Sequence, residues 1–457
     1  MKTKEQIPPP RTNCDEDFTP LLLRENKGDL LFVKCAAVLW VLKNPVFPIF
    51  SKGFNMPRVV VTGLGLVIAN GIGVTNAWNA LMNGKDGTAE LKSFDSSQFK
   101  VHRACEVKDF EIDTVFEKET TANTIHKYTY SAAKEALKDS GLDDIAESNR
   151  ERSGVAIGTL AGELPPFEYL LRNTPEDKAN GFDMGVALTY PPSSLTTLLS
   201  EDFGFEGPNM VSLNACSSGN HAIAWALDLL HEGKVDVMLV GGGELIPQTE
   251  FTHFHNLKAL APEKCQPFDK ERKGLIIGEG AGIMVLETLE SASKRDAVIY
   301  AELKGYGMSC DGHHMTAPHP EGAGAIVAMA NALSMANLTY KDVDYINAHG
   351  TGTPLNDRME TLAIKSIFKE QANEIPVSSI KSMIGHTMGA ASAIESVVSC
   401  LAIKNNEIPP TIHYETPDPE CDLDYVPNEG RETEVNCVIN NSFAFGGNNV
   451  TNIFSKL

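Results

Sequence analysis

Short apolar runs alternate with longer helical patterns from Met56 to the end of the chain. Runs of four to six apolar residues, rich in β-branched side chains, predict buried strands. The clearest strands are predicted at 58–62, 154–158, 235–240 and 282–286, with helices at 130–139 and 222–230 among them. Strands and helices in alternation predict an α/β fold whose sheets are covered by helices on both faces.

One arrangement occurs twice along the chain. Residues 210–214 predict a strand, which leads through small residues into a helix ending near 231–234. Residues 376–380 predict a second strand, followed by the small residues 385–391 and a helix ending near 404–407. In both units, polar and reactive residues lie where the strand gives way to the helix. This repetition predicts two similar halves that face one another, with one site between them.

Residues 1–55 differ from the rest and form a leader. Its apolar stretch, 30–50, is interrupted by lysines and prolines, so it falls short of the roughly 18 to 20 apolar residues of a membrane span. Acidic residues precede that stretch, which is unlike a secretory or organelle signal. We expect the leader to be either disordered or an upstream stretch included by too early a start codon, and we favour the second interpretation. Removal of the leader should leave activity intact.

Composition narrows the function. With 60 acidic and 39 basic residues, the 457-residue chain has a formal net charge of -21, which argues against nucleic acid as the main partner. An acidic partner must therefore dock on a local basic patch. Nine cysteines without paired spacing predict a reduced, cytoplasmic protein rather than a disulfide framework. No Cys-x-x-Cys or similar cluster predicts a structural metal.

Cys216 is the candidate nucleophile. It lies between a predicted strand and a predicted helix, where Ser217, Ser218 and Gly219 favour a turn and a helix start. A thiol there faces the positive end of the helix dipole and free backbone N–H groups, which favour the thiolate and can stabilise a carbonyl under attack. Most free cysteines are instead small buried hydrophobes, and we expect that structural role for the remaining ones after the leader. These are Cys105, Cys265, Cys310, Cys400, Cys421 and Cys437, and the same role is expected for Cys35 within the leader.

Two histidines stand among small residues. His349 is followed by Gly350 and His386 is preceded by Gly385, so each imidazole has the clearance that a site admitting substrate requires. Lys381 has an ordinary interpretation as a surface lysine. Beside an imidazole, its positive charge would keep the histidine neutral. A cluster of three further histidines, at 313–319, has no carboxylate at ligand spacing and predicts no metal site.

These motifs together resemble the β-ketoacyl-acyl-carrier-protein synthases of the thiolase superfamily, on the elongating branch. The resemblance covers nearly all of the chain after Met56. It rests on six motifs in order, namely Val61-Thr62-Gly63-Leu64-Gly65, Asn214-Ala215-Cys216-Ser217-Ser218, Gly278-Glu279-Gly280-Ala281-Gly282, Ala348-His349-Gly350-Thr351, Lys381-Ser382-x-x-Gly385-His386 and Phe445-Gly446-Gly447. It implies a thiolase-like α/β fold of five layers, α-β-α-β-α. The nucleophile would lie in an N-terminal half, 56–306, and the histidines and lysine in a C-terminal half, 307–457.

The resemblance also implies a reaction. Cys216 would take an acyl chain from a carrier-protein thioester, and His349 and His386, supported by Lys381, would decarboxylate the malonyl extender and stabilise its enolate. The other implied roles are an oxyanion hole from the N–H groups of Cys216 and Phe445, a gate at Phe445, substrate binding by Thr351, Thr353, Phe443 and Gly446, and support from Asp357, Glu360 and Glu395. No cofactor or metal is implied, because the phosphopantetheine arrives on the acyl carrier protein. A homodimer, or a heterodimer with a related subunit, is implied as well.

Two departures from the family pattern bear on the pathway. Arg272-Lys273-Gly274-Leu275 replaces the usual Arg-Asp-Gly-Phe, and Ala444 replaces a glycine of the gating loop. Alanine disfavours positive φ, so we expect Ala444 to stiffen that loop. Both departures make polyketide or polyene synthesis credible beside fatty acid elongation.

Two other functions compete with this one. A CoA-dependent thiolase-type reaction needs a second cysteine near the C-terminus, where Cys437 is the only candidate. A non-catalytic partner subunit of another synthase is the second alternative. The intact set of Cys216, His349, His386 and Lys381 argues against it.

Overall fold

The computed structural model describes residues 56–110, 124–143, 147–162, 164–173 and 190–457. The predictions for the leader, 1–55, lie outside the described residues. Within the described residues, no helix has the length and apolar character needed to cross a membrane.

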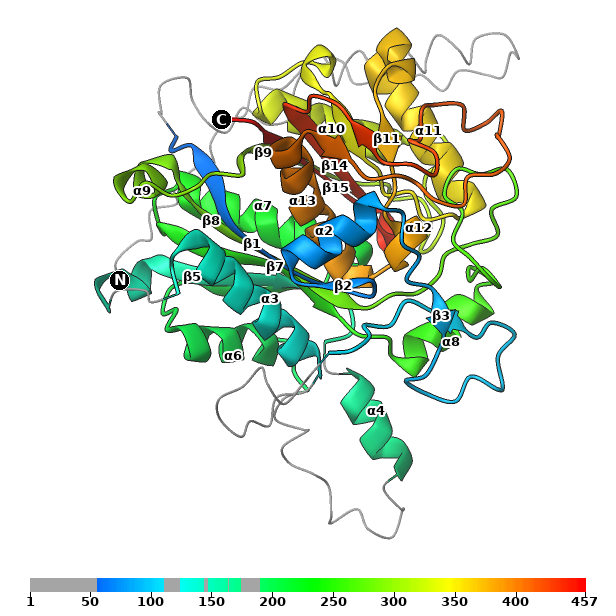
Figure 1. The fold of residues 1–457 in the computed structure, drawn as a ribbon, viewed down its shortest axis with the longest axis horizontal. Helices are drawn as coiled ribbons and strands as arrows, with labels where there is room; N and C mark the ends of the chain where they lie inside the picture. The colour runs from blue at the N-terminus through cyan, green and yellow to red at the C-terminus, as the bar shows by residue number, and fades with distance from the viewer. Residues whose placement is uncertain (1–55, 111–123, 144–146, 163, 174–189) are drawn as a thin grey trace, which may run out of the picture. The chain divides into compact units, whose positions relative to one another are not determined.

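A mixed sheet of eleven strands runs through both halves of the fold (Figure 1). Its order is β6-β5-β7-β8-β1-β9-β15-β14-β10-β11, with β2 paired to β1. The strands are β1 Val59–Ile68, β2 Gly71–Ile72, β5 Ser153–Gly158, β6 Asn209–Ser212, β7 Val237–Glu244, β8 Gly280–Thr288, β9 Ala301–Cys310, β10 Tyr345–Asn347, β11 Val377–Ser378, β14 Cys437–Phe443 and β15 Asn448–Ser455. Two small two-stranded sheets, β3 Ala89–Glu90 with β4 Arg103–Ala104 and β12 Glu407–Ile408 with β13 Arg431–Glu432, lie apart from it.

The two ends of this sheet repeat one pattern. In one half β6, β5 and β7 are parallel, and β8 and β1 follow antiparallel. In the other half β11, β10 and β14 are parallel, and β15 and β9 follow antiparallel. The predicted pair of similar halves is therefore confirmed.

The halves meet in one continuous sheet. β1 and β9 pair antiparallel through Val60 opposite Glu302 and Val61 opposite Ala301. The expected boundary at residue 306 falls inside β9, the strand that makes this junction.

Helices complete the layers. They are α2 Val74–Met82, α3 Thr124–Ser140, α4 Leu164–Asn173, α6 Ser194–Phe203, α7 Ser218–His231, α8 Gln248–Asn256, α9 Leu289–Lys294, α10 Ala323–Met335, α11 Pro354–Phe368, α12 Lys381–Ile384 and α13 Met388–Asn405. α3 packs on β1 and β8, and α10 packs on β9 and β15. α7 and α13 contact each other and strands of both halves, so they form the central layer of the α-β-α-β-α arrangement.

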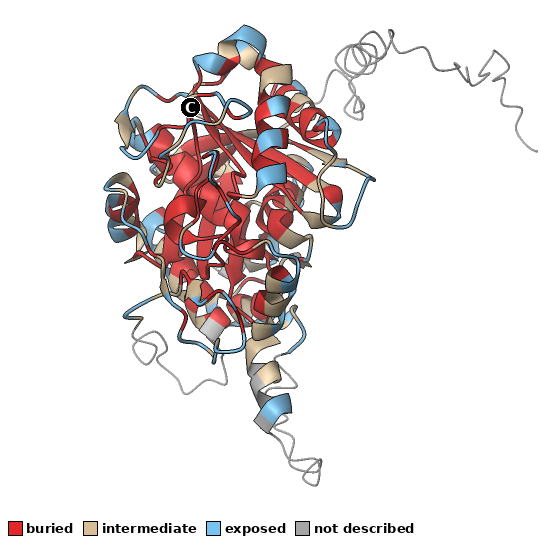
Figure 2. Cartoon of the chain, turned by 90° about the vertical axis from the view of Figure 1, so that its right-hand side faces the viewer, coloured by how far each residue is buried: buried red, intermediate tan, exposed pale blue. Residues whose placement is uncertain are grey.

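The central layer is the most buried part of the fold. Every residue of α13 from Met388 to Ile403 is buried, and buried segments fill the interior in Figure 2. Gly219 of α7 and Ala393 of α13 show how closely the two helices approach, because a Cβ atom at Gly219 would lie 2.7 Å from the Cβ atom of Ala393. This close contact brings together the segments just before α7 and α13, where Cys216 and His386 lie.

β1 extends farther than the sequence pattern predicts. The strand was expected to end at Thr62, before the glycines, but it continues through Gly63 and Gly65 to Ile68. A Cβ atom at Gly63 would lie 2.0 Å from the carbonyl oxygen of Ala136, and one at Gly65 would lie 1.8 Å from that of Ala132. The glycines thus let α3 lie directly on β1 rather than ending the strand.

Candidate active site

Cys216 lies in a tight turn between β6 and α7. The turn, Ala215–Ser217, is a 3₁₀ helix, and Ala215 has a φ of 50°, in the left-handed region that non-glycine residues rarely adopt. The N–H of Asn214 donates to Oγ of Ser218 (2.8 Å), and Oγ of Ser442 donates to the carbonyl oxygen of Cys216 (3.0 Å). Hydrogen bonds on both sides therefore hold the turn in this conformation.

His349 follows β10 and is held by α11. Its N–H and that of Gly350 donate to the two carboxylate oxygens of Glu360, both at 2.8 Å. His386 follows α12. Its N–H donates to the carbonyl oxygen of Ile276 (2.7 Å), and the N–H of Met388 donates to its Nδ1 (3.2 Å). Because Nδ1 accepts, the proton of the neutral His386 ring lies on Nε2, which is left to donate to a substrate.

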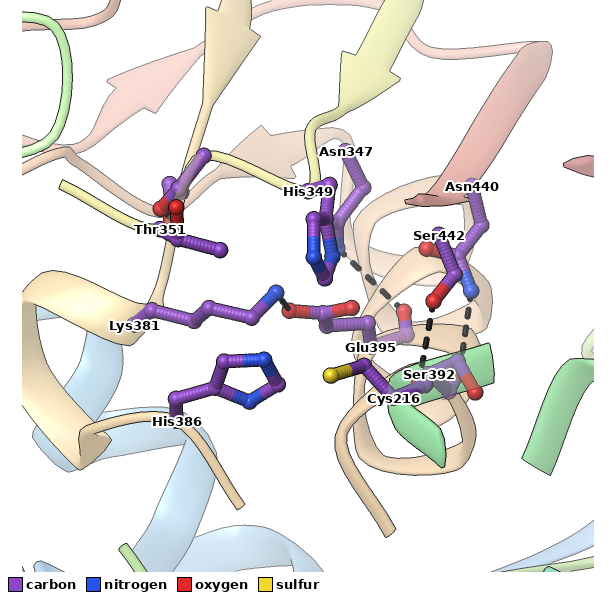
Figure 3. Close-up of polar contacts among 12 residues, drawn as sticks. Cys216, Asn347, His349, Thr351, Lys381, His386, Ser392, Glu395, Asn440 and Ser442 are labelled. Carbon is purple, nitrogen blue, oxygen red and sulfur yellow. Dashed lines mark hydrogen bonds and ion pairs between the residues drawn. The ribbon is translucent and has the colours of Figure 1, made fainter. Parts of the chain in front are cut away.

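The three predicted reactive side chains converge. Sγ of Cys216 and one ring nitrogen each from His349 and His386 all lie within 4.8 Å of one another (Figure 3). The two imidazole rings are 5.4 Å apart between centroids and nearly perpendicular, at 83°. Residues separated by up to 170 positions thus share one small chamber, as the sequence predicted.

Lys381 is not a surface residue. Its ammonium group forms a short ion pair with Glu395 of α13, and both side chains are 1% exposed. Figure 3 shows this pair beside His386 and Cys216. Burial raises the pKa of Glu395 to about 7, against the opposing effect of the Lys381 charge and hydrogen bond. Oε2 of Glu395 is shielded from solvent and has no hydrogen-bond partner among the described residues.

Both histidines are neutral. Burial lowers the pKa of each imidazole well below its usual value, and the positive charge of Lys381 lowers it further. The expected effect of Lys381 is present, but desolvation is the larger cause. Both rings therefore act as neutral hydrogen-bonding groups at physiological pH.

The expected preference of Cys216 for the thiolate is wrong for the resting site. Burial raises the pKa of the thiol to about 12, which outweighs the opposing effects of Lys381 and of the N–H groups of Phe445 and Cys216 itself. Cys216 as a residue is only 5% exposed, so its thiolate would be poorly solvated. The resting nucleophile is a thiol, and the surrounding donors can stabilise its charge only as it reacts.

A cavity of about 270 Å³ connects the reactive residues with solvent. Cys216, His349 and His386 lie at its buried end, whereas Leu257, Lys258, Lys273 and Leu355 are exposed and line its mouth. The residues predicted to bind substrate all line the same cavity, namely Thr351, Thr353, Phe443 and Gly446, together with Phe445. Oγ1 of Thr351 and Oγ1 of Thr353 are 2.8 Å apart, so two hydroxyl groups face the channel as a pair.

The loop around Phe445 differs from the prediction at Ala444. Ala444 is extended, with a φ of -96°, which any residue adopts without strain. The positive φ angles belong to Gly446 and Gly447, at 79° and 75°. Alanine at 444 therefore does not stiffen the loop by the mechanism expected. The ring of Phe445 packs 5.6 Å from that of Phe254, between centroids.

Asp357 and Glu360 hold the loop that carries His349. Glu360 accepts the two N–H groups described above, and Asp357 accepts from the N–H groups of Phe268 (2.8 Å) and Gly352 (3.2 Å). Nε of Arg272 lies 3.8 Å from Oδ2 of Asp357, so the altered Arg-Lys-Gly-Leu motif keeps an ion pair with this loop.

Cys437 lies far from this chamber. It begins β14, whereas Phe443, at the other end of the strand, lines the cavity. Six residues of strand separate their Cα atoms by about 20 Å. This placement removes the second cysteine that a thiolase-type reaction would need.

Several residues of the site were not foreseen from the sequence. Helix α8 brings Phe254 to the cavity wall, and Leu257 and Lys258 follow at the mouth. Leu257 and Lys258 follow Phe254 by three and four residues, and such positions share one face of a helix. This spacing could have indicated that the three residues line the same surface. Glu244, which accepts from the N–H of Gly389 at the start of α13 (3.0 Å), had no recognisable motif.

Comparison with known proteins gives a consistent result. Residues 56–292 match the family model "Beta-ketoacyl synthase, N-terminal domain", and residues 300–415 match "Beta-ketoacyl synthase, C-terminal domain". The chain is 41% identical over 413 residues to a 3-oxoacyl-[acyl-carrier-protein] synthase 2 of Coxiella burnetii, covering 88% of the chain and 99% of that relative. A Staphylococcus aureus protein of the same name is 40% identical over 407 residues, covering 87% and 98%.

Solved structures agree with these sequence relatives. The ishigamide ketosynthase/chain length factor superposes with a TM-score of 0.82 at 36% identity, covering 88% of this chain and 100% of that one. AntDE:AntF, a type II PKS acyl-carrier protein in complex with its ketosynthase, gives the same TM-score and coverage at 33% identity.

Proposed function

Since the chain belongs to the β-ketoacyl synthase family, we propose that it joins acyl and malonyl units by a decarboxylating Claisen condensation. The product is a 3-oxoacyl-acyl-carrier protein, in fatty acid or polyketide and polyene biosynthesis. The observation that carries the proposal is the convergence of the Cys216 sulfur with two neutral imidazoles at the buried end of a solvent-connected cavity.

In the first half-reaction, Sγ of Cys216 bonds to the carbonyl carbon of the acyl thioester. The carbon–sulfur bond to the pantetheine arm breaks, and the departing thiolate takes up the proton that the Cys216 thiol loses. The N–H groups of Cys216 and Phe445 lie where they act on the sulfur, which supports their role as an oxyanion hole for the same reaction centre.

In the second half-reaction, the malonyl group loses carbon dioxide and its electron pair forms an enolate. Nε2–H of His386 is available to donate to the enolate oxygen, because Nδ1 is already occupied by the N–H of Met388. His349 supplies the second imidazole of the pair. The enolate carbon then attacks the acyl-Cys216 carbonyl, and the Cys216 sulfur leaves with the electron pair of the broken bond.

The partners follow from the same geometry. We propose that an acyl carrier protein delivers its phosphopantetheine through the cavity past Thr351 and Thr353, so that no resident cofactor is required. Lys258 and Lys273, exposed at the mouth, provide a local positive charge for an acidic partner on a chain of net charge -21.

A dimer, with a second copy or a related subunit, is proposed by analogy with the ishigamide ketosynthase/chain length factor. The seven described cysteines are free, which fits a reducing compartment such as the cytoplasm.

The test is a condensation assay with malonyl-loaded carrier protein and acyl donors, comparing the wild type with Cys216→Ala. We expect the variant to lose condensation by at least about a thousandfold and to form no acyl adduct by mass spectrometry, because the nucleophile is gone. Cys437→Ala is the control and should retain both. Normal condensation by Cys216→Ala would refute the assignment of the nucleophile. Loss of activity in Cys437→Ala alone would favour a thiolase-type reaction.

A further inference from the structure

Two lysines lie on neighbouring segments at the mouth of the cavity. Lys258 follows helix α8 and Lys273 precedes the segment that leads to β8, and both are exposed and line the mouth. The two segments run parallel, because Leu260 pairs with Leu275 in a parallel bridge. The N–H of Leu275 donates to the carbonyl oxygen of Ala259 (2.9 Å). Each lysine comes two residues before its paired leucine, so the same register brings the two lysines together.

The close approach of the two segments extends to the residues beside the lysines. Ala259 follows Lys258 directly, and Gly274 follows Lys273 directly. A Cβ atom at Gly274 would lie 2.2 Å from the carbonyl oxygen of Ala259, so the backbones touch at this point. Each lysine is therefore one residue away from a contact between the two segments.

The two positive charges lack a counter-charge. Neither ammonium group forms an ion pair or a hydrogen bond with another described residue. Asp311 is the one acidic residue lining this cavity among the described residues. Its Oδ1 accepts from Nδ2 of Asn449 and its Oδ2 from the N–H of His319, both at 2.8 Å. Neighbouring like charges repel, and a bound anion would relieve that repulsion.

The backbone gives no reason for a lysine at position 258. Lys258 ends α8 with a φ of 56°, a conformation that glycine adopts at lower cost and usually supplies at the end of a helix. A positive charge does gain some energy at the C-terminus of a helix. That gain does not account for Lys273, which follows no helix.

The cavity as a whole fits a ligand with different groups at its two ends. Cys216 lies at the buried end, Thr351 and Thr353 line the wall, and the two lysines are at the mouth. A linear ligand that brings a thioester to Cys216 would place its other end beside the lysines. Phosphopantetheine is such a ligand, because its thiol and its phosphate are at opposite ends. Lysine binds phosphate as a point charge.

We propose that Lys258 and Lys273 together bind the phosphate group of the pantetheine arm while its thioester lies at Cys216. This inference rests on the proposed function. It narrows the role of the two lysines from the general attraction of an acidic partner to the recognition of one phosphate group, the one that joins the arm to the carrier protein.

The test compares octanoyl-pantetheine, which has no phosphate, with octanoyl-phosphopantetheine. Formation of acyl-Cys216 is followed by intact mass spectrometry below saturation, and the readout is the ratio of the two rates, which a general loss of folded protein does not change. We expect the wild type to favour the phosphorylated donor by about three- to thirtyfold at low salt, the effect of two exposed ion pairs. The preference should largely disappear at about 1 M salt, where charges are screened.

Substitution of the lysines tests their part in this preference. The double variant Lys258→Gln/Lys273→Gln should bring the ratio close to one, and each single variant should give an intermediate ratio. Lys138→Gln is the matched control, because Lys138 of α3 is exposed and does not line the cavity. It should keep the ratio of the wild type.

A ratio of one in the wild type would overturn the inference and leave the proposed function standing. A wild-type ratio in the double variant, or a preference that persists at high salt, would overturn it as well. If no donor labels Cys216 of the wild type, the proposed function fails and the inference fails with it.

The source of the phosphate is tested with two further donors, octanoyl-carrier protein and octanoyl-CoA. We expect the double variant to lose rate with the carrier protein by about the same factor as with octanoyl-phosphopantetheine. A loss confined to octanoyl-CoA would overturn the assignment to the arm of the carrier protein. A loss with the carrier protein alone, beside a wild-type ratio of one, would mean that the lysines bind acidic side chains of the partner instead.

Discussion

At the scale of single residues, burial sets the protonation states on which the chemistry depends. His349 and His386 are neutral because desolvation and Lys381 oppose their protonation, and Cys216 rests as a thiol because burial disfavours its thiolate. The sequence indicated which groups react and that Lys381 would help to keep a histidine neutral, but its prediction of a thiolate at Cys216 was wrong. Burial also strengthens the hydrogen bonds that form when charge develops during reaction.

The neutral state of His386 predicts a dependence of stability on pH. Its pKa in the folded protein is well below 6.5, so below that pH the unfolded chain binds one more proton and the free energy of unfolding falls. His386→Asn lacks this penalty. Lowering the pH from 6.5 to 5.5 should therefore lower the free energy of unfolding of the wild type by about 1 kcal/mol more than that of the variant.

Urea unfolding at the two pH values measures this difference. His102→Asn, at an exposed position, is the control and should give no such change. A difference between wild type and His386→Asn that stays constant with pH would mean that the ring is not held neutral.

The loop around Phe445 offers a matched pair of substitutions. Gly446→Ala forces a side chain into a φ of 79°, and we expect it to lower the free energy of unfolding by about 1 kcal/mol and to slow acylation of Cys216. Ala444→Gly changes an extended residue, and we expect less than about half that effect. Thermal unfolding and acylation rates check both. An equal or larger effect of Ala444→Gly would restore the view that residue 444 controls the loop.

At the scale of elements, the central helices position the site. α7 and α13 each follow a short turn that carries a reactive residue, and their close packing brings the two turns together. The repeat of strand, small residues and helix was visible in the sequence. It could be interpreted because hydrophobic periodicity is a local property. The closeness of the two helices was not visible, because it depends on how residues far apart in the chain pack.

Gly219→Ala tests this packing. The new methyl group would lie 2.7 Å from both the Cβ atom and the backbone nitrogen of Ala393, so one helix must shift. We expect a loss of about 1–3 kcal/mol in the free energy of unfolding. Adding Ala393→Gly removes one of the two clashes and should restore part of the loss, as a double-mutant cycle in urea would measure. Purely additive effects would show that the two positions do not touch.

At the scale of the whole molecule, the two halves share a sheet and a central layer. β1 and β9 join the halves through two residue pairs, and Arg58 beside β1 donates to Glu302 of β9 at 2.6 and 3.0 Å. The larger link is the pair of helices α7 and α13, which contact strands of both halves. Neither half can bury its inner face without them.

This sharing predicts that the halves unfold together. Cys105 in the first half and Cys437 in the second are both buried and free, so each reports exposure of its own half. We expect both thiols to become reactive toward an alkylating reagent at the same urea concentration, as read by peptide mass spectrometry. Cys310, which is exposed, should react without urea and serves as the control. Separate midpoints for Cys105 and Cys437 would show that the halves are independent folding units.

The sequence by itself determined the elements and the reactive groups. Strand β5, helix α3 and the residues Cys216, His349 and His386 were all predictable, because periodicity and motif spacing are written in neighbouring positions. Only the tertiary structure decided how far β1 extends, that Cys216 rests as a thiol, and that Lys381 is buried in an ion pair with Glu395. These properties depend on burial and on distances between segments that are remote in the chain, and desolvation acts only once the chain has closed around them.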